Sequence, residues 1–571
     1  MRIRGRYAAL VTIGVFAATV AGCGKSVDEA TAPATSSAAA GETASGTTSA
    51  GATTEPASSQ APTNERGVTS PAPVGAVSDP LVWGVYRETN SLDPIYAFDY
   101  PENTVLFTMC EAVLRQQADG SIAPGLGDVT SPDPLTYVIT LKDGVSFWDG
   151  SKLTADDVVY SLGRARDAKL GGFYPQVFTR VKDIKATGPL EVTITLTEPD
   201  AWFRGELSGP PGTVLSRAYV ESKGEKFGTV DGGTMCTGPF KLDSWKTGEG
   251  VTVVKNDAYW DTTLKPMASK VTFKGFPDDA AVTAALLTGE LDGYYPLQLT
   301  TLDQLRTSDK VNVYQGPSAA SDALIISDLK GTLGDVRVRR ALSMAIDRQG
   351  LIDQVYKGAA SVPHALSNAG TWGYAPEVFK AAWDALPPMD QDLEAAKALI
   401  KEAGAEGKPI TLGTSSELTA LNTEAQAVQS AAESIGLKAE LKSVSAANYI
   451  NFFIDPEARK GIDGFFTGNY GDYSDPAALL STLVLAEGSQ NYSGYANPDV
   501  LAAMNAARSE ADDTKRAQHV VDAQKIITDE LPWIPVAAPD TVLVMNKDIT
   551  GAPTSFVYMF GPWLASVGAA G

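Results

Sequence analysis

The segment from residue 24 to residue 79 limits where this chain can build a hydrophobic core. It consists mainly of Ala, Thr, Ser, Gly, Pro and Glu, and it contains no Leu, Ile, Met, Phe, Tyr or Trp. Such a segment cannot bury enough apolar surface to offset the entropy that a chain loses on folding. We therefore expect residues 23–79 to form a disordered tether, and the folded body to begin at residue 80.

The first 22 residues have the pattern of an export signal. Arg2, Arg4 and Arg6 precede an apolar run from residue 8 to residue 22. About fifteen residues of helix span roughly 22 Å, which is short of the roughly 30 Å hydrocarbon core of a membrane. A cleaved signal peptide in residues 1–22 therefore fits better than a membrane-spanning helix.

Cys23 ends this run in the sequence Val20-Ala21-Gly22-Cys23, which resembles a bacterial lipobox. The resemblance implies that Cys23 is lipidated and becomes the new N-terminus. An ordinary signal peptide followed by a chance cysteine is the alternative. We expect an extracytoplasmic protein that is anchored to the outer face of the bacterial cell membrane through lipidated Cys23.

Charge and composition exclude several classes of site. Asp and Glu outnumber Lys and Arg by 68 to 46, which argues against a nucleic-acid partner. With only His364, His519 and three cysteines, the chain cannot form a His-rich metal site or a four-cysteine zinc module. The common nucleotide-binding, zinc-protease and serine-hydrolase motifs are absent. We expect no catalytic residue, no cofactor and no metal, and hence no enzyme.

The body alternates strand and helix patterns, which predicts a mixed α/β fold. Residues 135–141 alternate apolar and polar side chains, and a turn at 143–144 leads to a second alternating stretch at 145–147. Thr154 and Asp157 have the spacing of a capping box that opens a helix. Further strands are expected at 191–197 and 252–255, and further helices at 278–288, 335–356, 391–403, 418–435 and 499–529.

Six short motifs occur in an order that resembles one family of binding proteins. The longest, GVSFWDGSKLTADDVVYSL, runs from Gly144 to Leu162. The others are LDP at 92–94, TGPFKL at 237–242, DVRVRRAL at 335–342, DYSDP at 472–476 and PWIP at 532–535. Together they resemble the oligopeptide- and dipeptide-binding solute-binding proteins of ABC transporters, family 5. That family often has His where Trp148 stands.

The resemblance covers residues 80–571 and implies a two-lobed, periplasmic-binding-protein-like fold of class II. Lobe I would hold residues 80–315, with a small subdomain at about 99–210, and the chain would return to it in residues 536–571. Lobe II would hold residues 316–535. The ligand would bind in a hinged cleft between the lobes, and the closed form would dock on a membrane permease.

The function implied is a lipoprotein that captures di- or oligopeptides and delivers them to an ABC permease, without making or breaking a bond. Its partners would be the peptide, the permease subunits and the lipid anchor, and it would be a monomer. The same fold hosts oligosaccharides, nickel chelates and opines, so a non-peptide ligand stays open. A surface sensor without a transport role and an extracellular hydrolase with two facing carboxylates are further alternatives.

Asp472 is the strongest candidate for contact with a ligand. In peptide-binding relatives an acidic residue at this place pairs with the α-ammonium group of the ligand. A carboxylate enclosed in a cleft selects a cation because burial without a partner is costly. A turn aspartate is the alternative. Tyr470 and Tyr473 flank it, and Asn469 stands where relatives often carry Trp, which leaves the preferred ligand open.

Two loops supply further candidates. Phe98, Asp99 and Tyr100 follow the LDP motif, and in the family this loop offers backbone groups to an extended ligand. Trp372 and Tyr374 form a second loop pair that could wall a pocket. Core packing is the alternative for the aromatic residues of both loops.

His364 and two cysteines complete the candidates. His364 lies in a Pro-containing loop, where it could contact the ligand or lie on the surface. Cys110 and Cys236 are the cysteines that remain besides Cys23. The extracytoplasmic environment permits a disulfide between them, and two buried free thiols are the alternative, which only geometry decides.

Overall fold

The structure is a computed structural model that describes residues 67–276, 278–296, 300–416, 418–486 and 488–571. The predicted signal peptide, the predicted lipidation site Cys23 and residues 24–66 of the predicted tether lie outside the described residues. Within the described ranges, no helix has both the length and the apolar character needed to cross a membrane.

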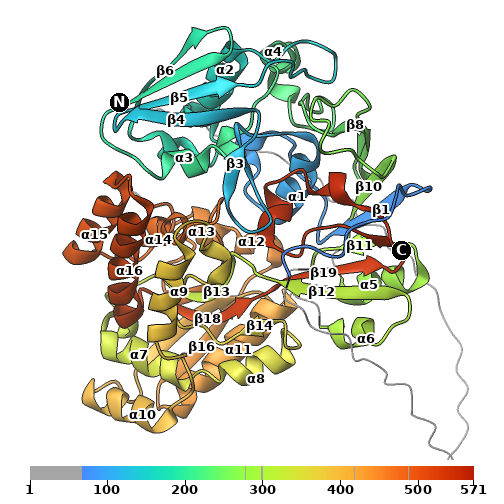
Figure 1. Cartoon of the computed structure of the whole chain (residues 1–571). Helices are drawn as coiled ribbons and strands as arrows, with labels where there is room; N and C mark the ends of the chain where they lie inside the picture. Colours follow the sequence, from blue (N-terminus) through green and yellow to red (C-terminus); the bar gives the residue numbers. More distant parts are fainter. Residues whose placement is uncertain (1–66, 277, 297–299, 417, 487) are drawn as a thin grey trace, which may run out of the picture. The chain divides into compact units, whose positions relative to one another are not determined.

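A seven-stranded sheet forms the centre of one half of the folded body (Figure 1), which we name lobe I. Its parallel and antiparallel strands bury a core that contains Trp83 and Phe273. In spatial order the strands are β12 (Val311–Gly316), β19 (Thr541–Asn546), β11 (Gly293–Tyr294), β1 (Leu81–Val85), β10 (Lys270–Gly275), β9 (Gly250–Lys255) and β8 (Phe240–Lys246).

A six-stranded sheet forms the centre of the other half, which we name lobe II (Figure 1). In spatial order its strands are β14 (Ala360–Ser361), β18 (Trp533–Pro539), β13 (Ser321–Ile326), β17 (Gly464–Asn469), β15 (Pro409–Thr414) and β16 (Lys438–Ser443). The chain passes from one sheet to the other between β12 and β13 and returns between β18 and β19. Residues 317–320 and residue 540 are therefore the two connections between the sheets.

A third, four-stranded antiparallel sheet extends lobe I, in the order β4 (Gly127–Asp133), β5 (Thr136–Leu141), β7 (Glu191–Leu196) and β6 (Val181–Gly188). Helix α2 (Ala155–Arg166) packs with it in one core, and the predicted capping box of Thr154 and Asp157 is present. Two local predictions here were wrong. Leu135 lies outside β5 and is exposed, and residues 145–147 form only an isolated bridge, because a second turn follows at once.

The predicted helices are present, and two of them are divided. Helix α5 (Asp279–Thr288) has Asp278 and Gly289 as its caps, α10 spans Leu393–Glu402 and α11 spans Thr419–Ser434. The helix expected at 335–356 is instead α7 (Val336–Ala345) and α8 (Arg348–Gln354). The one expected at 499–529 is α15 (Pro498–Ser509) and α16 (Asp513–Glu530). Asp347 and Asp512 explain the divisions, since each caps the second helix with its side chain.

Residues 67–79 correct the predicted extent of the tether. Thr69 forms a β-bridge with Pro553, and Gly75 forms one with Ala569. The buried Ser70 hydroxyl donates to the Ala552 carbonyl at 2.8 Å. These residues therefore belong to the folded body, because the C-terminal segment satisfies their backbone groups.

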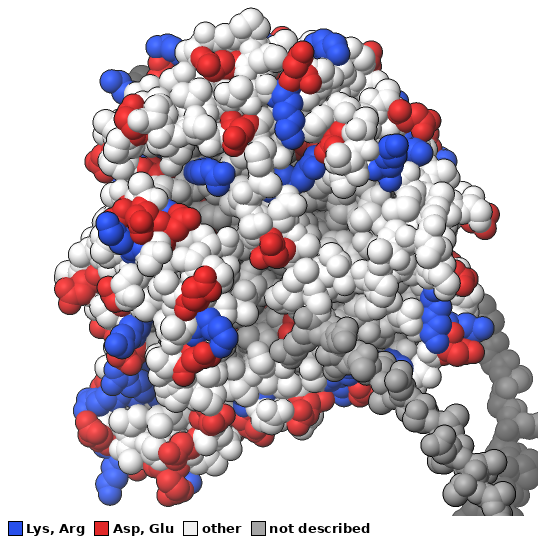
Figure 2. Space-filling model, in the orientation of Figure 1, with Lys and Arg blue, Asp and Glu red and all other residues white. Residues whose placement is uncertain are grey.

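Cys110 and Cys236 form a disulfide in the core of lobe I, where both are buried. Cys110 directly follows helix α1 (Tyr100–Met109), so the bond ties the end of that helix to the TGPFKL segment. On the face shown in Figure 2, acidic and basic side chains are interspersed rather than separated by sign.

Candidate ligand-binding site

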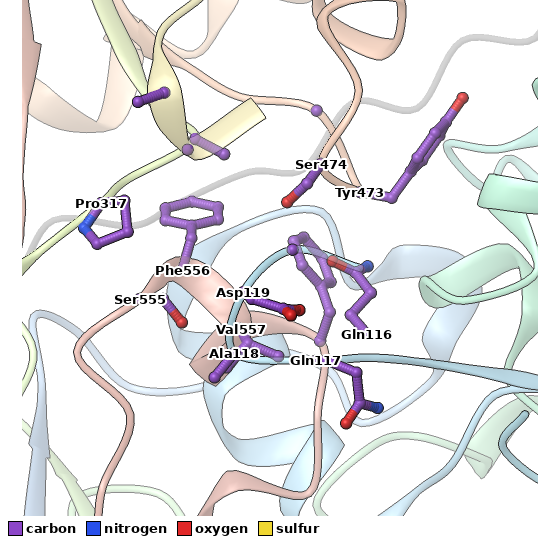
Figure 3. A pocket seen from close by; sticks show the side chains of 16 residues that line it. Gln116, Gln117, Ala118, Asp119, Pro317, Tyr473, Ser474, Ser555, Phe556 and Val557 are labelled. Carbon is purple, nitrogen blue, oxygen red and sulfur yellow. The ribbon is translucent and has the colours of Figure 1, made fainter. Parts of the chain in front are cut away.

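The two lobes enclose a small cavity (Figure 3). Its volume is about 40 Å³, which holds a few water molecules and is too small for a dipeptide. The described lobes are therefore close together. Lobe I contributes Gln116 to Gly120 and residues near Phe556, lobe II contributes Gly370, Gly471, Tyr473 and Ser474, and Pro317 and Ala319 come from one of the two connections.

A hairpin of lobe I reaches into lobe II beside this cavity. It consists of β2 (Leu114–Gln116) and β3 (Ile122–Pro124), with Gly120 in the turn. A Cβ on Gly120 would lie 3.0 Å from the Ser474 side chain and 3.6 Å from the Cα of Gly373. The Gln116 amide donates to the backbone carbonyl of Asp472 at 2.6 Å. The hairpin therefore holds the loop that carries Asp472.

Asp472 lies between β17 and helix α14 (Pro476–Val484), at the contact with lobe I. A Cβ on Gly209 of lobe I would lie 3.4 Å from the Cβ of Asp472. The residue is partly exposed, and among the described residues its carboxylate has no hydrogen-bond or ion-pair partner. Burial raises the pKa of the Asp472 carboxyl to about 7. Such a carboxylate favours a cationic partner, which a ligand can supply.

Tyr470 joins the Asp472 loop to the other predicted loop. Its hydroxyl donates to the Phe98 carbonyl at 2.7 Å, and its ring lies 5.0 Å from that of Tyr100. Phe98 is 41% exposed and packs on Phe173, with ring centroids 4.1 Å apart. Residues 98–100 of lobe I and residues 470–472 of lobe II therefore lie together.

Asp99 differs from Asp472 because it is fully partnered. It accepts hydrogen bonds from the Tyr86 hydroxyl, from the Arg87 guanidinium at 2.6 Å and from the Tyr100 backbone N–H at 2.8 Å. Arg87 also pairs with Glu102 at 2.7 Å. The side chain of Asp99 therefore caps helix α1 and is neutralised within its own lobe.

Tyr473 and Asn469 face different surroundings. The Tyr473 ring packs where a Cβ on Gly205 of lobe I would lie, only 2.3 Å away, and its buried hydroxyl has no partner among the described residues. The Asn469 amide exchanges two hydrogen bonds with the Gln490 amide, at 2.7 and 3.1 Å. The amide of Asn469 therefore uses both its oxygen and its nitrogen in hydrogen bonds within lobe II.

The remaining candidates pack around helix α9 (Pro376–Ala385) of lobe II. His364 stacks on Trp383 and lies 2.6 Å from the Leu386 carbonyl through its Nδ1. The Trp372 ring lies 6.0 Å from that of Trp383, and the Tyr374 ring lies 5.2 Å from Phe379. His364 is therefore not brought together with Asp472. The loop of Trp372 and Tyr374 instead lies against the Asp472 loop, because the Gly373 N–H donates to the Ser474 carbonyl at 3.0 Å.

Sequence reasoning missed three residues of this region, namely Gln116, Tyr174 and Glu206. Glu206 is the last residue of helix α3 (Phe203–Glu206), and its Oε2 is buried without a partner among the described residues. Burial, and then the charge of Asp472, raises the pKa of Glu206 well above its usual range. The sequence marks this contact only weakly, through Gly205 and Gly209. Their lack of side chains permits the close approach of the lobes.

Comparisons with known proteins assign the family. The family model described as bacterial extracellular solute-binding proteins, family 5 Middle, matches residues 122–491. The probable D,D-dipeptide-binding periplasmic protein DdpA of Escherichia coli (strain K12) is 26% identical over 515 residues, which cover 86% of this chain and 93% of DdpA. The glutathione-binding protein GsiB of Salmonella paratyphi A is 27% identical over 493 residues, which cover 84% of this chain and 92% of GsiB.

The fold agrees with this assignment. The periplasmic binding protein DppA from Helicobacter pylori, solved in complex with the peptide STSA, superposes with a TM-score of 0.74 at 24% identity. The superposition covers 86% of this chain and 98% of DppA. The predicted two-lobed α/β fold and the predicted family are confirmed. The chain belongs to the bacterial extracellular solute-binding proteins of family 5.

Proposed function

We propose that this protein is an extracytoplasmic substrate-binding lipoprotein that captures peptides between its lobes and delivers them to an ABC permease. The observation that carries the proposal is the Asp472 carboxylate, which lies at the contact between the lobes without a partner among the described residues. The names of DdpA and GsiB, and the peptide bound to DppA, support a ligand of this class. Lipidated Cys23 would hold the receptor at the outer face of the membrane.

In this proposal Asp472 binds the α-ammonium group of the peptide. An ammonium group donates three hydrogen bonds and supplies the positive charge that this carboxylate lacks, so binding removes the cost of leaving it unpaired. The pairing also explains how a peptide would be oriented, because only its amino end carries this group.

Residues 98–100 would align the peptide backbone. The Phe98 carbonyl accepts a hydrogen bond from the Tyr470 hydroxyl of the opposite lobe. When the lobes move apart about residues 317–320 and residue 540, that bond breaks and the carbonyl becomes free to accept from a peptide N–H. Closure around the ligand would then restore the contacts between the lobes.

Thermal unfolding tests the proposal on a chain that begins at residue 24. A pool of free dipeptides at 100 times Kd adds about 2.7 kcal/mol, which raises the melting temperature by several degrees. The same pool with acetylated amino groups should give no shift, and Asp472→Asn should lose the shift that the wild-type protein shows. Absence of a shift with either pool would contradict the proposal and direct the search to oligosaccharides, nickel chelates and opines.

A further inference from the structure

Glu206 of lobe I and Asp472 of lobe II approach each other where the lobes meet. Gly205 lies against the Tyr473 ring, and Gly209 lies against Asp472, where Cβ atoms would be 2.3 and 3.2 Å from the nearest atom of the opposite lobe. Glu206 stands between these two glycines. The segment that carries it therefore lies directly on the loop that carries Asp472.

Polar atoms without partners gather at this place. Glu206 Oε2 and the Tyr473 hydroxyl are both buried and unpartnered among the described residues, and Tyr473 is only 4% exposed. The charge of Glu206 acts on Tyr473 and on the buried Tyr174, which also senses Asp472. Buried polar groups in native proteins are satisfied by protein, water or ligand, so these atoms mark a place where a bound polar group can be held.

The other charged groups that face Glu206 do not supply that partner. They are Asp472, Asp200, Asp475 and Arg508. Arg508 pairs with Asp200 at 2.6 Å, and Asp475 caps helix α14 through the Ala477 N–H at 2.7 Å. Glu206 and Asp472 therefore remain as the two carboxylates of this cluster without a hydrogen-bond partner among the described residues.

We propose that Glu206 is a second ligand-binding carboxylate, and that with Asp472 it makes the site select peptides whose first residue carries a second positive charge, such as lysine. The inference rests on the proposed function and adds a specificity to it. A single ammonium group neutralises one carboxylate and leaves the other buried with its charge or forced to take a proton. A ligand with two positive charges neutralises both, and the Tyr174 and Tyr470 rings offer apolar surface to the methylene groups of its side chain.

Calorimetry with two matched dipeptides tests this specificity on the chain from residue 24. Lysyl-alanine and norleucyl-alanine differ only by the terminal amino group of the first side chain. The wild-type protein should bind lysyl-alanine at least tenfold more tightly at pH 7.5. Glu206→Gln should abolish that preference, so that the variant binds the two dipeptides with equal affinity. Glu225→Gln, which changes an exposed glutamate of lobe I, is the matched control and should keep the preference.

Either equal affinities in the wild-type protein or a preference that survives in Glu206→Gln would overturn the inference. In both cases peptide binding itself would persist, so the proposed function would stand. Failure of both peptides to bind would instead remove the proposed function and this inference with it. If Glu206→Gln does not fold, the number of protons that the wild-type protein releases on binding tests the inference instead. Lysyl-alanine should release more protons than norleucyl-alanine, and equal release would contradict the inference.

Discussion

Asp99 and Asp472 lie in one region of the protein, but their carboxylates differ in whether they have hydrogen-bond and ion-pair partners. Asp99 accepts hydrogen bonds from Tyr86, Arg87 and Tyr100, all within lobe I. Asp472 has no such partner among the described residues, and burial raises its pKa. A carboxylate with a cationic partner is part of the scaffold, whereas one without a partner is available to a cationic ligand.

The charged residues around the two aspartates differ as well. Arg87 also pairs with Glu102, so two acidic side chains share one guanidinium. Asp472 instead lies close to a second unpartnered carboxylate, that of Glu206. One cluster contains its own cation, whereas Glu206 and Asp472 have no paired cation among the described residues.

Asp472→Asn gives the largest expected effect. Loss of one partner of a buried charge pair typically costs about 2–5 kcal/mol of binding energy, so affinity for free dipeptides should fall at least thirtyfold. Calorimetry measures the loss. Because the variant removes an unpartnered buried charge, the ligand-free protein should melt at an equal or higher temperature. A lower melting temperature would show that Asp472 is partnered in the free protein.

Arg87→Met tests the Asp99 cluster and should act on stability. It leaves the buried Glu102 and the part-exposed Asp99 without their cation, and we expect a loss of about 2–3 kcal/mol, since Arg87 is itself part-exposed. Denaturant unfolding measures the change. Arg217→Met, which breaks the exposed pair with Glu221, is the control and should leave the free energy of unfolding nearly unchanged. Equal losses of unfolding free energy in the two variants would show that the Arg87 ion pairs stabilise the protein no more than an exposed pair does.

Both the stability of the protein and its affinity for a ligand should depend on pH through Asp472. Its pKa in the folded, ligand-free protein is raised to about 7, above the value of about 4 in an unfolded chain. The folded state therefore binds more protons, and this contribution to stability is lost as pH rises from about 4 towards 7. Affinity for an ammonium ligand should change in the opposite sense and increase about fivefold from pH 6 to pH 7, because about 9% of a carboxyl with this pKa is ionised at pH 6 and about half at pH 7. Titration at several pH values checks this, and Asp472→Asn should flatten both profiles.

Asp99→Asn gives the smallest expected effect. Asparagine still caps helix α1, because it can accept the Tyr100 N–H, so the loss falls on the other carboxylate oxygen, which accepts from Tyr86 and Arg87. We expect about 1 kcal/mol of lost stability and little change in peptide affinity. A fall in affinity as large as that of Asp472→Asn would place Asp99 in direct contact with the ligand.

The parts of the fold that the sequence predicted depend on neighbours along the chain. The alternation in β5, the capping box of α2 and the Asp278 and Gly289 caps of α5 are all local patterns. The helix divisions at Asp347 and Asp512 were missed because an aspartate can lie within an apolar helical pattern or cap a new helix. The packing of residues 67–79 onto the folded body was not predicted, because their hydrogen-bond partners lie near the C-terminus, at Ala552 and Ala569.

The candidate site could be predicted only in part, for the same reason. Asp472 and residues 98–100 were found through motifs, and the structure brings them together through Tyr470. Asn469 was expected at the site, yet Gln490 occupies its amide. Glu206 belongs to no motif, and only its burial beside the Asp472 loop marks it.

Local motifs are enough to predict the family and the two-lobed α/β fold, because turn, cap and core residues recur at characteristic local spacings. Which carboxylates have a partner is visible only in the folded protein. Pairing depends on segments far apart in the chain, as in the ion pair of Asp200 with Arg508, which lie 308 residues apart. A short motif cannot encode whether such a distant partner carries a positive charge.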